Sequence, residues 1–369
     1  MNINGKNKWI FRGLMRQYRA GIIGVGKSGC QLARSIGQTE MFNLCAISDK
    51  DKEKVAIAGE ELDVQWYDDP RQMILKEDLD MIILAIPTHA CGEYVQLAAK
   101  QKIHLFKQAP LARTLPEASK WHDLMLQSGA EFFIGAPYRF APGYRKAFDK
   151  IQSGLLGNIY LVRGEHFLHY DGHLDWRGDP KLAGGGVLIE QAYGLIDLVN
   201  WALRVPEKVF CLNTNHCAKR IVPTCLTEDS AILSMHFASG LMGNIITSWM
   251  AGPEHECMVF HGVEGSIKAS LSEYAHYAPD GKLADSESFD VSMTTLMSEQ
   301  LTYIANYLLQ RNIDIDEDRI GNEGDLEELV VSSSSADHLA NVSVIEAAYL
   351  SVRTQMPEEI LVYGSVYKI

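Results

Sequence analysis

The chain has 369 residues, of which 47% are apolar and 22% charged, and its formal net charge is −13. This composition is that of a soluble globular protein long enough for two domains. The negative charge disfavours nucleic acid and anionic membrane surfaces as partners, and no apolar run approaches the roughly 20 residues that a membrane-spanning helix needs.

The start of the chain and the cysteines bear on where the protein acts. Residues 1–19 carry five basic side chains and no acidic one, without the apolar segment of a secretory signal. We therefore interpret residues 1–17 as a flexible N-terminal extension, with a transit peptide as the lesser alternative. The seven cysteines are scattered and form no C-x-x-C pair, which favours reduced thiols and a cytoplasmic location.

From residue 18 to about residue 140, β-like and helix-like segments alternate. We expect strands at 18–25, 42–48, 64–67, 81–86, 103–107 and 132–134, and helices at 30–36, 51–62, 70–75, 92–100 and 115–127. Strands that alternate with helices predict an α/β domain with a Rossmann-type, doubly wound parallel sheet over residues 18–140.

Beyond residue 140 the β-like segments follow one another more directly. After a helix at 144–152, we expect strands at 160–166, 209–212, 230–237, 241–250, 257–261 and 265–270. This order predicts an α+β domain over residues 141–369 with a large, mostly antiparallel open sheet. A helix near 339–353 would pack back on the first domain. The acidic stretch 311–330 is interpreted as a solvated loop or helix face.

A dinucleotide-binding signature lies between the first strand and the first helix. Gly24-x-Gly26-x-x-Gly29 places glycine where the turn is tight, where the backbone approaches a pyrophosphate, and where helix and strand pack closely. Asp49 follows twenty residues later and would bind the ribose hydroxyls, which favours NAD over NADP. Lys50 beside it weakens that preference.

Other residues are expected to line the same cofactor cleft. The carboxyl ends of parallel strands meet at one edge of the sheet, where the ligand binds in such folds. His89 could equally cap the helix that follows it. The candidates are Lys27, Ser28, Pro87, Thr88, His89 and Gln108.

Over residues 18–355 the sequence resembles the Gfo/Idh/MocA family of nicotinamide-dependent sugar and polyol oxidoreductases. The resemblance rests on Gly24–Gly29, on the block His104–Ala112 (HLFKQAPLA) and on the block Gly184–Asp197 (GGGVLIEQAYGLID). Shorter supporting stretches are Tyr138–Phe140, Ser153–Gly157, Asp175–Arg177 and Glu264–Ser266.

The chain departs from the family at two positions that carry chemistry. The family's Glu-Lys-Pro is Gln108-Ala109-Pro110 here, so alanine replaces the lysine that assists proton transfer. The family's aspartate and histidine, four residues apart, are Glu190 and Gly194. Alcohol oxidation needs a base near the hydroxyl proton, and neither alanine nor glycine can serve as one.

Four residues are candidates for the missing catalytic role. Glu190 keeps a carboxylate, Tyr193 neighbours the lost histidine position, and Lys107 lies two residues before Ala109. A solvated lysine at the strand end and a tyrosine that only packs are the alternatives. His173 belongs to a histidine-rich loop and is the fourth candidate.

That loop, with His166, His169, Tyr170, His173 and Asp175, invites both a substrate-binding and a metal-binding interpretation. We expect no metal, because the spacing falls on a strand running into a loop rather than on one helix face. By resemblance, the substrate-binding residues are Tyr138, Arg139, His169, Trp176 and Arg177.

The resulting expectation is an NAD-dependent oxidoreductase that acts on a sugar, cyclitol or sugar derivative with rearranged proton-transfer residues. Two alternatives remain: a non-catalytic NAD-binding sensor or partner subunit, and redox-neutral NAD-dependent glycoside cleavage or elimination. The resemblance also implies a homodimer or homotetramer that pairs through the open face of the second sheet.

Overall fold

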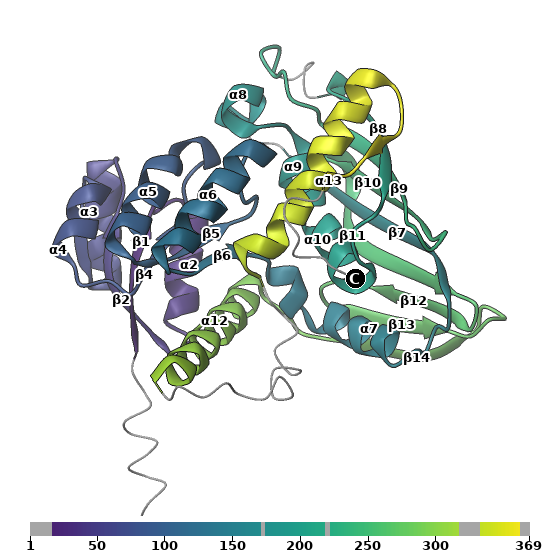
Figure 1. Cartoon of the computed structure of the whole chain (residues 1–369), viewed down its shortest axis with the longest axis horizontal. Helices are drawn as coiled ribbons and strands as arrows, with labels where there is room; N and C mark the ends of the chain where they lie inside the picture. The colour runs from purple at the N-terminus through teal and green to yellow at the C-terminus, as the bar shows by residue number, and fades with distance from the viewer. Residues whose placement is uncertain (1–16, 171–173, 218–221, 317–332, 362–369) are drawn as a thin grey trace, which may run out of the picture.

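The computed structural model describes residues 17–170, 174–217, 222–316 and 333–361. His173, one of the catalytic candidates, lies outside the described residues. Figure 1 shows two bodies, each built around its own sheet, with one long helix between them and a second long helix below the first body.

The first body is a six-stranded parallel sheet in the order β3-β2-β1-β4-β5-β6. Its strands are β1 (Tyr18–Ile23), β2 (Phe42–Ser48), β3 (Gln65–Tyr67), β4 (Met81–Leu84), β5 (His104–Gln108) and β6 (Phe132–Gly135). Its helices are α2 (Lys27–Ile36), α3 (Lys52–Leu62), α4 (Pro70–Lys76), α5 (Gly92–Gln101) and α6 (Leu115–Ser128). This is the Rossmann arrangement expected from the sequence.

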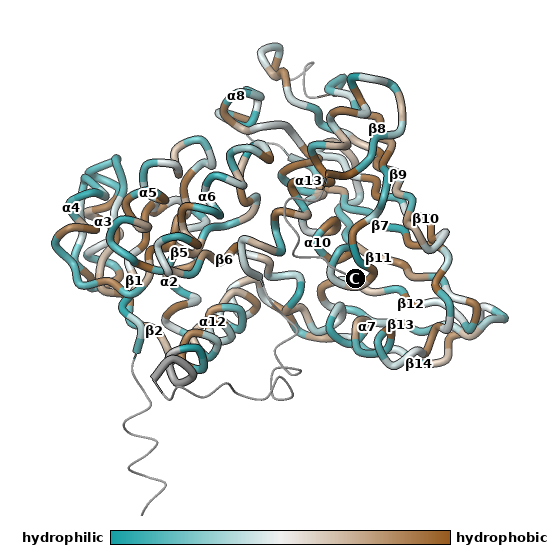
Figure 2. Tube along the Cα trace, viewed as in Figure 1, coloured by the Kyte–Doolittle hydropathy of each residue, from teal (hydrophilic) through white to brown (hydrophobic). Residues whose placement is uncertain are grey.

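Helix α2 begins three residues earlier than the hydrophobic pattern indicates. We expected its start at Cys30, whereas the helix begins at Lys27, directly after Gly26. The first three helical residues carry no periodic apolar side chain, because this end faces the cofactor cleft rather than the core. Figure 2 shows the helices of this body alternating between hydrophilic and hydrophobic residues, as amphipathic surface helices do.

The second body is a nine-stranded sheet in the order β14-β13-β12-β11-β7-β10-β9-β8-β15. Its strands are β7 (Ile159–His169), β8 (Lys208–Thr214), β9 (Ser230–His236), β10 (Met242–Ser248), β11 (Met250–Gly262), β12 (Gly265–Ala269), β13 (Glu273–Tyr277), β14 (Leu283–Ser288) and β15 (Glu358–Glu359). All of the pairs are antiparallel except β7 with β10. The expected large, mostly antiparallel sheet is therefore confirmed.

Helices cover one face of this sheet. Helices α7 (Pro142–Gln152), α10 (Ala192–Leu203) and α13 (Ser335–Thr354) pack on its strands, and α13 also contacts α6 of the first body (Figure 1). The Leu115 amide donates to Glu346 of α13 at 2.8 Å. Helix α13 therefore joins the two bodies and brings its own side chains to the region between them.

Strands β13 and β14 and helix α12 (Met293–Asp316) were not expected from the sequence. Helix α12 packs on α2 of the first body (Figure 1). Met297, Leu301, Ile304 and Leu308 of α12 are buried at helical spacing, so the signal was present in the sequence. The expected solvated loop or helix face at 311–330 begins within this helix, which continues to Asp316, and residues 317–330 lie outside the described residues.

No single helix in the described ranges is long and apolar enough to cross a membrane. One bent pair of helical segments, Pro180–Glu190 with Ala192–Leu203, is together long and apolar enough by length and composition alone.

Candidate active site

The nucleotide-binding turn lies between β1 and α2. Gly24 has φ +97°, and a Cβ atom there would lie 2.5 Å from the Ala85 carbonyl oxygen. A Cβ at Gly29 would lie 1.8 Å from the Gly24 carbonyl oxygen, so only glycine allows this approach of helix to strand. At Gly26 the nearest atom to such a Cβ is the Lys54 Nζ at 3.9 Å, which leaves open space above the turn.

The start of α2 offers free donors to this open space. The first amide bonded within the helix is that of Cys30, which donates to the Gly26 carbonyl at 2.9 Å. Lys27, Ser28 and Gly29 precede it, and no side chain caps the helix. Backbone amides in this position bind phosphate oxygens, and the helix dipole favours their negative charge. The turn therefore fits a pyrophosphate.

Asp49 follows β2 at the same edge of the sheet. Its Oδ2 accepts from the Val25 amide at 2.9 Å and its Oδ1 from the Asp51 amide at 3.0 Å. These two bonds fix the carboxylate beside the turn while each oxygen keeps a second lone pair. The remaining lone pairs fit the two hydroxyls of a ribose, as the sequence predicts for an NAD site.

A cleft of about 280 Å³ extends from this turn along the carboxyl ends of β4 and β5. Six of the ten residues expected to bind the cofactor line it: Gly26, Lys27, Ser28, Pro87, Thr88 and Gln108. His89 does not line it. This histidine is half-buried in η1 (Thr88–Ala90), 6.0 Å from the Trp176 ring, and its Nδ1 has no partner among the described residues.

Lys107 lies in β5, lines the cleft and is 2% exposed. Its Nζ donates to Thr88 Oγ1 at 3.2 Å, to the Gln108 carbonyl at 3.0 Å and to the Pro110 carbonyl at 2.6 Å. Burial lowers the pKa of the Lys107 amine. The alternative of a solvated strand-end lysine is therefore wrong, because the side chain turns inward and holds the 108–110 turn.

Glu190 is the last residue of the short helix α9 (Val187–Glu190) and lines the cleft. Its Oε2 accepts from Arg177 Nε at 2.8 Å. The Arg177 guanidinium in turn lies 4.5 Å above the Trp176 ring in η3 (Asp175–Gly178). The structure thus brings these three predicted residues together, with one carboxylate oxygen held by arginine and no described residue donating to the other.

A second cavity, which we call the side cavity, opens from the cleft. It has a volume of about 150 Å³ and is lined by Ala109, Gly135, Ala136, Pro137, Tyr138, His166, Glu190, Gln191, Tyr193, Gly194, Asp197 and His338. Ala109 and Glu190 also line the cleft. Ala109 and Gly194, at which the resemblance predicts departures from the family, both line this one cavity.

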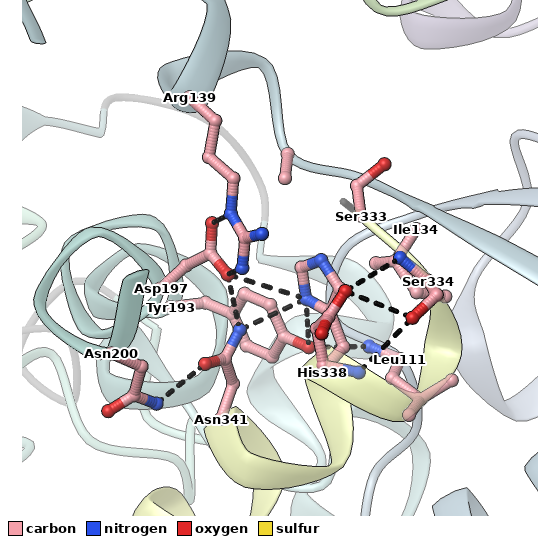
Figure 3. A network of polar contacts seen from close by, with 12 residues as sticks. Leu111, Ile134, Arg139, Tyr193, Asp197, Asn200, Ser333, Ser334, His338 and Asn341 are labelled. Carbon is pink, nitrogen blue, oxygen red and sulfur yellow. Dashed lines mark hydrogen bonds and ion pairs between the residues drawn. The ribbon is translucent and has the colours of Figure 1, made fainter. Parts of the chain in front are cut away.

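A buried polar network (Figure 3) includes Tyr193, Asp197 and His338, which line the side cavity. Arg139 of η2 (Pro137–Phe140) pairs with Asp197 of α10 through two bonds, at 2.8 and 2.6 Å. Asn341 Nδ2 donates to Asp197 Oδ1 at 2.7 Å. Although Arg139 was expected to bind substrate, its guanidinium is held by Asp197, and Arg139 lines neither the cleft nor the side cavity.

Tyr193 belongs to the same network. Its hydroxyl accepts from the Leu111 amide at 3.3 Å and lies 3.1 Å from His338 Nδ1. Burial raises the pKa of Tyr193 far above its usual range. The hydroxyl therefore stays protonated at neutral pH and acts as a hydrogen-bonding group.

The expected histidine loop contributes less than its sequence suggests. His169 is exposed at the end of β7, outside both the cleft and the side cavity, whereas His166 lines the side cavity. Among the described residues, one group has the geometry to hold a metal ion. It consists of Glu165 on β7 and His255 and Cys257 on β11. That group shares no residue with the cleft or the side cavity.

Sequence reasoning missed His338, Asn341 and Gln191 as residues of the site. His338 and Asn341 lie near the start of α13, more than 140 residues from Tyr193 and Asp197. Their burial follows helical spacing, which indicates core packing and gives no sign of a site. Only the packing of α13 against α10 brings them to the side cavity.

Two family models match the chain. The model described as "Oxidoreductase family, NAD-binding Rossmann fold" matches residues 18–136. The model described as "GFO/IDH/MocA C-terminal domain" matches residues 144–268.

Several characterised proteins are similar over about two thirds of the chain. Myo-inositol 2-dehydrogenase of Thermotoga maritima is 25% identical over 68% of this chain and 75% of its own length. Levoglucosan dehydrogenase of Pseudarthrobacter phenanthrenivorans is 24% identical over 69% of this chain and 73% of its own length. A 2,7-anhydro-N-acetylneuraminate hydratase of Escherichia coli is 24% identical over 69% of this chain and 68% of its own length.

The fold is also that of solved structures. Levoglucosan dehydrogenase in complex with NADH and levoglucosan superposes with a TM-score of 0.81 at 18% identity, over 94% of this chain and all of the other. The WlbA dehydrogenase from Bordetella pertussis, in complex with NADH and UDP-GlcNAcA, superposes with a TM-score of 0.76 at 18% identity. The superposition covers 94% of this chain and 99% of the WlbA chain.

Proposed function

Because the chain belongs to the Gfo/Idh/MocA family, we propose that it is an NAD-dependent oxidoreductase that oxidises a carbinol carbon of a sugar or cyclitol. One observation carries the proposal: Glu190 lines both the nucleotide cleft and the side cavity. A substrate hydroxyl placed between the two spaces would meet this carboxylate.

The chain's own residues account for cofactor binding. The amides at the start of α2 would hold the pyrophosphate and Asp49 the ribose hydroxyls, with Pro87, Thr88 and Gln108 beside the nicotinamide half. When bound, NAD supplies the hydride acceptor for the carbinol carbon. Lys107 fixes the 108–110 turn that forms this part of the cleft.

Oxidation of the alcohol also releases the hydroxyl proton, which needs an acceptor. We assign this role to Glu190, because Arg177 holds its Oε2 and no described residue donates to its Oε1. A substrate hydroxyl can therefore donate to Oε1 without displacing a protein contact. Trp176, beneath the Arg177 guanidinium, offers an apolar face to a sugar ring.

The proposal is tested by following NADH formation with a panel of sugars and cyclitols. Glu190→Gln removes the proton acceptor and keeps the shape, so kcat/KM should fall by about 10²–10⁴-fold while NAD affinity stays within about twofold. Glu264→Gln, an exposed residue beside β12, is the matched control and should change neither. Equal turnover by Glu190→Gln and the wild type would refute the assignment.

A second candidate function is redox-neutral elimination or hydration with tightly held NAD. The observation that favours it is that two of the similar proteins are named as 2,7-anhydro-N-acetylneuraminate hydratases, and hydration is a redox-neutral reaction. In the same assay, loss of substrate without accumulation of NADH would select this function. NAD binding without loss of any substrate would select a sensor or partner subunit.

We further propose a cytoplasmic homo-oligomer. All seven cysteines are free thiols, as expected in a reducing compartment. The face of the second sheet that points away from α7, α10 and α13 exposes apolar side chains, including Ile232, Leu212 and Met242. Light scattering on the purified protein should give a multiple of 41.2 kDa. A monomer mass would exclude the oligomer.

A further inference from the structure

The side cavity contains buried polar atoms that no described residue satisfies. They are His338 Nε2, Gln191 Oε1 and His166 Nδ1, and all three residues line the cavity. Buried polar groups in folded proteins almost always have hydrogen-bond partners. Three unsatisfied atoms around one cavity therefore indicate that the partners come from a bound molecule.

The network behind His338 fixes which of its nitrogens carries the proton. The Asp197 carboxylate can only accept, so the Asn341 atom that contacts Asp197 Oδ1 is the amide nitrogen Nδ2. The same Nδ2 lies 3.0 Å from His338 Nδ1. An amide nitrogen only donates, so Nδ1 accepts. Burial lowers the pKa of His338, which favours the neutral ring at pH 7. The single proton is therefore on Nε2.

The Tyr193 hydroxyl agrees with this tautomer. It accepts from the Leu111 amide at 3.3 Å and can donate its own proton to His338 Nδ1 at 3.1 Å. In Figure 3 the second ring nitrogen of His338 has no dashed contact and points away from Tyr193 and Asn341. His338 Nε2 is thus a fixed donor at the wall of the side cavity.

Gln191 supplies an acceptor at the same cavity. Its Nε2 donates to the His166 carbonyl at 2.6 Å and lies 3.5 Å from the Ser248 carbonyl. These two carbonyls fix the orientation of the amide, so Oε1 is the atom left without a partner. The side cavity therefore presents one fixed donor and one fixed acceptor.

We propose that the side cavity is a subsite for a neutral hydroxyl-bearing group of the substrate, with His338 Nε2 donating to the hydroxyl and Gln191 Oε1 accepting from it. A hydroxyl both accepts and donates, whereas a carboxylate only accepts. The inference rests on the proposed function and narrows its substrate class to neutral polyols, excluding uronic acids.

The size of the cavity agrees with part of a polyol. A volume of about 150 Å³ leaves room for several atoms of a ligand. Ala109 and Gly194 both line this space, and the ring of Tyr138 closes it beside Gly194.

The test measures binding instead of turnover. With saturating NAD, we would titrate myo-inositol, D-glucose and D-glucuronate by calorimetry into wild type, His338→Phe and His338→Gln. His338→Phe keeps the ring stacked on Tyr193 but removes the donor, so affinity for at least one neutral ligand should fall about tenfold. His338→Gln restores a donor and should recover most of the loss. His122→Phe, at a histidine that contacts Ser335 of α13 outside the cavity, is the matched control.

A spectroscopic readout covers variants that fold poorly. In protein labelled with ¹⁵N-histidine, His338 should show the Nε2–H tautomer, and neutral polyols should shift its Nε2 signal. The proposal is overturned if glucuronate binds more tightly than glucose, if no ligand shifts this signal, or if His338→Phe binds every polyol as the wild type does. If one of these results is found while Glu190→Gln still loses turnover, the subsite is rejected and the proposed function stands.

Discussion

The ring of Tyr138 occupies the space into which a side chain at position 194 would extend. A Cβ atom at Gly194 would lie 2.9 Å from Tyr138 Cε2 and 3.0 Å from Cδ2. A side chain at position 194 would therefore require the Tyr138 ring to move. Restoring the family's residues thus concerns three positions rather than two.

The combination Ala109→Lys with Gly194→His should not rescue dehydrogenase activity by itself. The new histidine must displace Tyr138, and overpacking of this kind costs about 1–3 kcal/mol of unfolding free energy. Adding Tyr138→Val should make the triple variant more stable than the sum of its separate effects predicts. Urea denaturation measures this coupling, and NADH formation shows whether proton transfer improves. Strictly additive free energies would mean that Tyr138 does not obstruct position 194.

Glu256 on β11 gives a prediction for pH. Burial raises its pKa to about 8, and the carboxyl accepts from the Tyr144 hydroxyl and the Leu271 amide. In the unfolded chain its pKa is about 4.3. Between these values the folded state binds more protons, so this group lowers stability as pH rises from about 4 to 8, by a few kcal/mol in total.

Glu256→Gln mimics the protonated carboxyl and should remove that slope. Chemical denaturation at several pH values compares the variant with wild type, and their difference should grow as pH approaches 8. Glu254→Gln, an exposed residue on the same strand, is the control. Burial lowers the pKa values of His104 and His166 to about 4 and also lowers the pKa of His338. These histidines raise the stability as pH rises towards about 6.5, opposite to Glu256, in both proteins. A constant difference across the pH range would contradict the prediction.

The nucleotide half of the site could be predicted from the sequence because its parts are local. Gly24, Gly26, Gly29 and Asp49 lie within one β-α-β unit, and each acts through its backbone or through one carboxylate. The parallel sheet followed from strands that alternate with helices. Such patterns need no knowledge of distant contacts.

The side cavity could not be predicted in this way. Ala109, Gly194 and His338 come from three distant segments, and the docking of α13 against α10 adds His338 to the cavity. The resemblance predicted small residues in place of two family side chains, but it could not show that Tyr138 lies against Gly194. Burial of Lys107 was likewise invisible, because its partners are two carbonyls and a hydroxyl that the fold places above it.

The Arg139–Asp197 pair should be structural. Both side chains are buried, with 5% and 2% exposed, and they form two bonds. Arg139→Met leaves an uncompensated buried carboxylate and should cost about 3–5 kcal/mol, whereas Arg139→Met with Asp197→Leu should recover much of the loss. Arg71→Met breaks the exposed pair with Asp69 and should cost at most about 1 kcal/mol. If Arg139→Met lowers the unfolding free energy by less than about 1 kcal/mol, the pair is not structural and Arg139 is again a candidate for substrate binding.

Lys107 should act by positioning the cleft rather than by moving a proton. All three of its amine contacts are protein oxygens, two of them in the 108–110 turn. Lys107→Met should therefore weaken NAD binding several-fold and lower the unfolding free energy by about 1–3 kcal/mol. Lys100→Met, at an exposed site on α5, is the control. The kcat of NAD-saturated Lys107→Met should keep the wild-type pH profile. A kcat that falls 100-fold and loses one ionisation, with NAD affinity unchanged, would instead identify Lys107 as the proton acceptor.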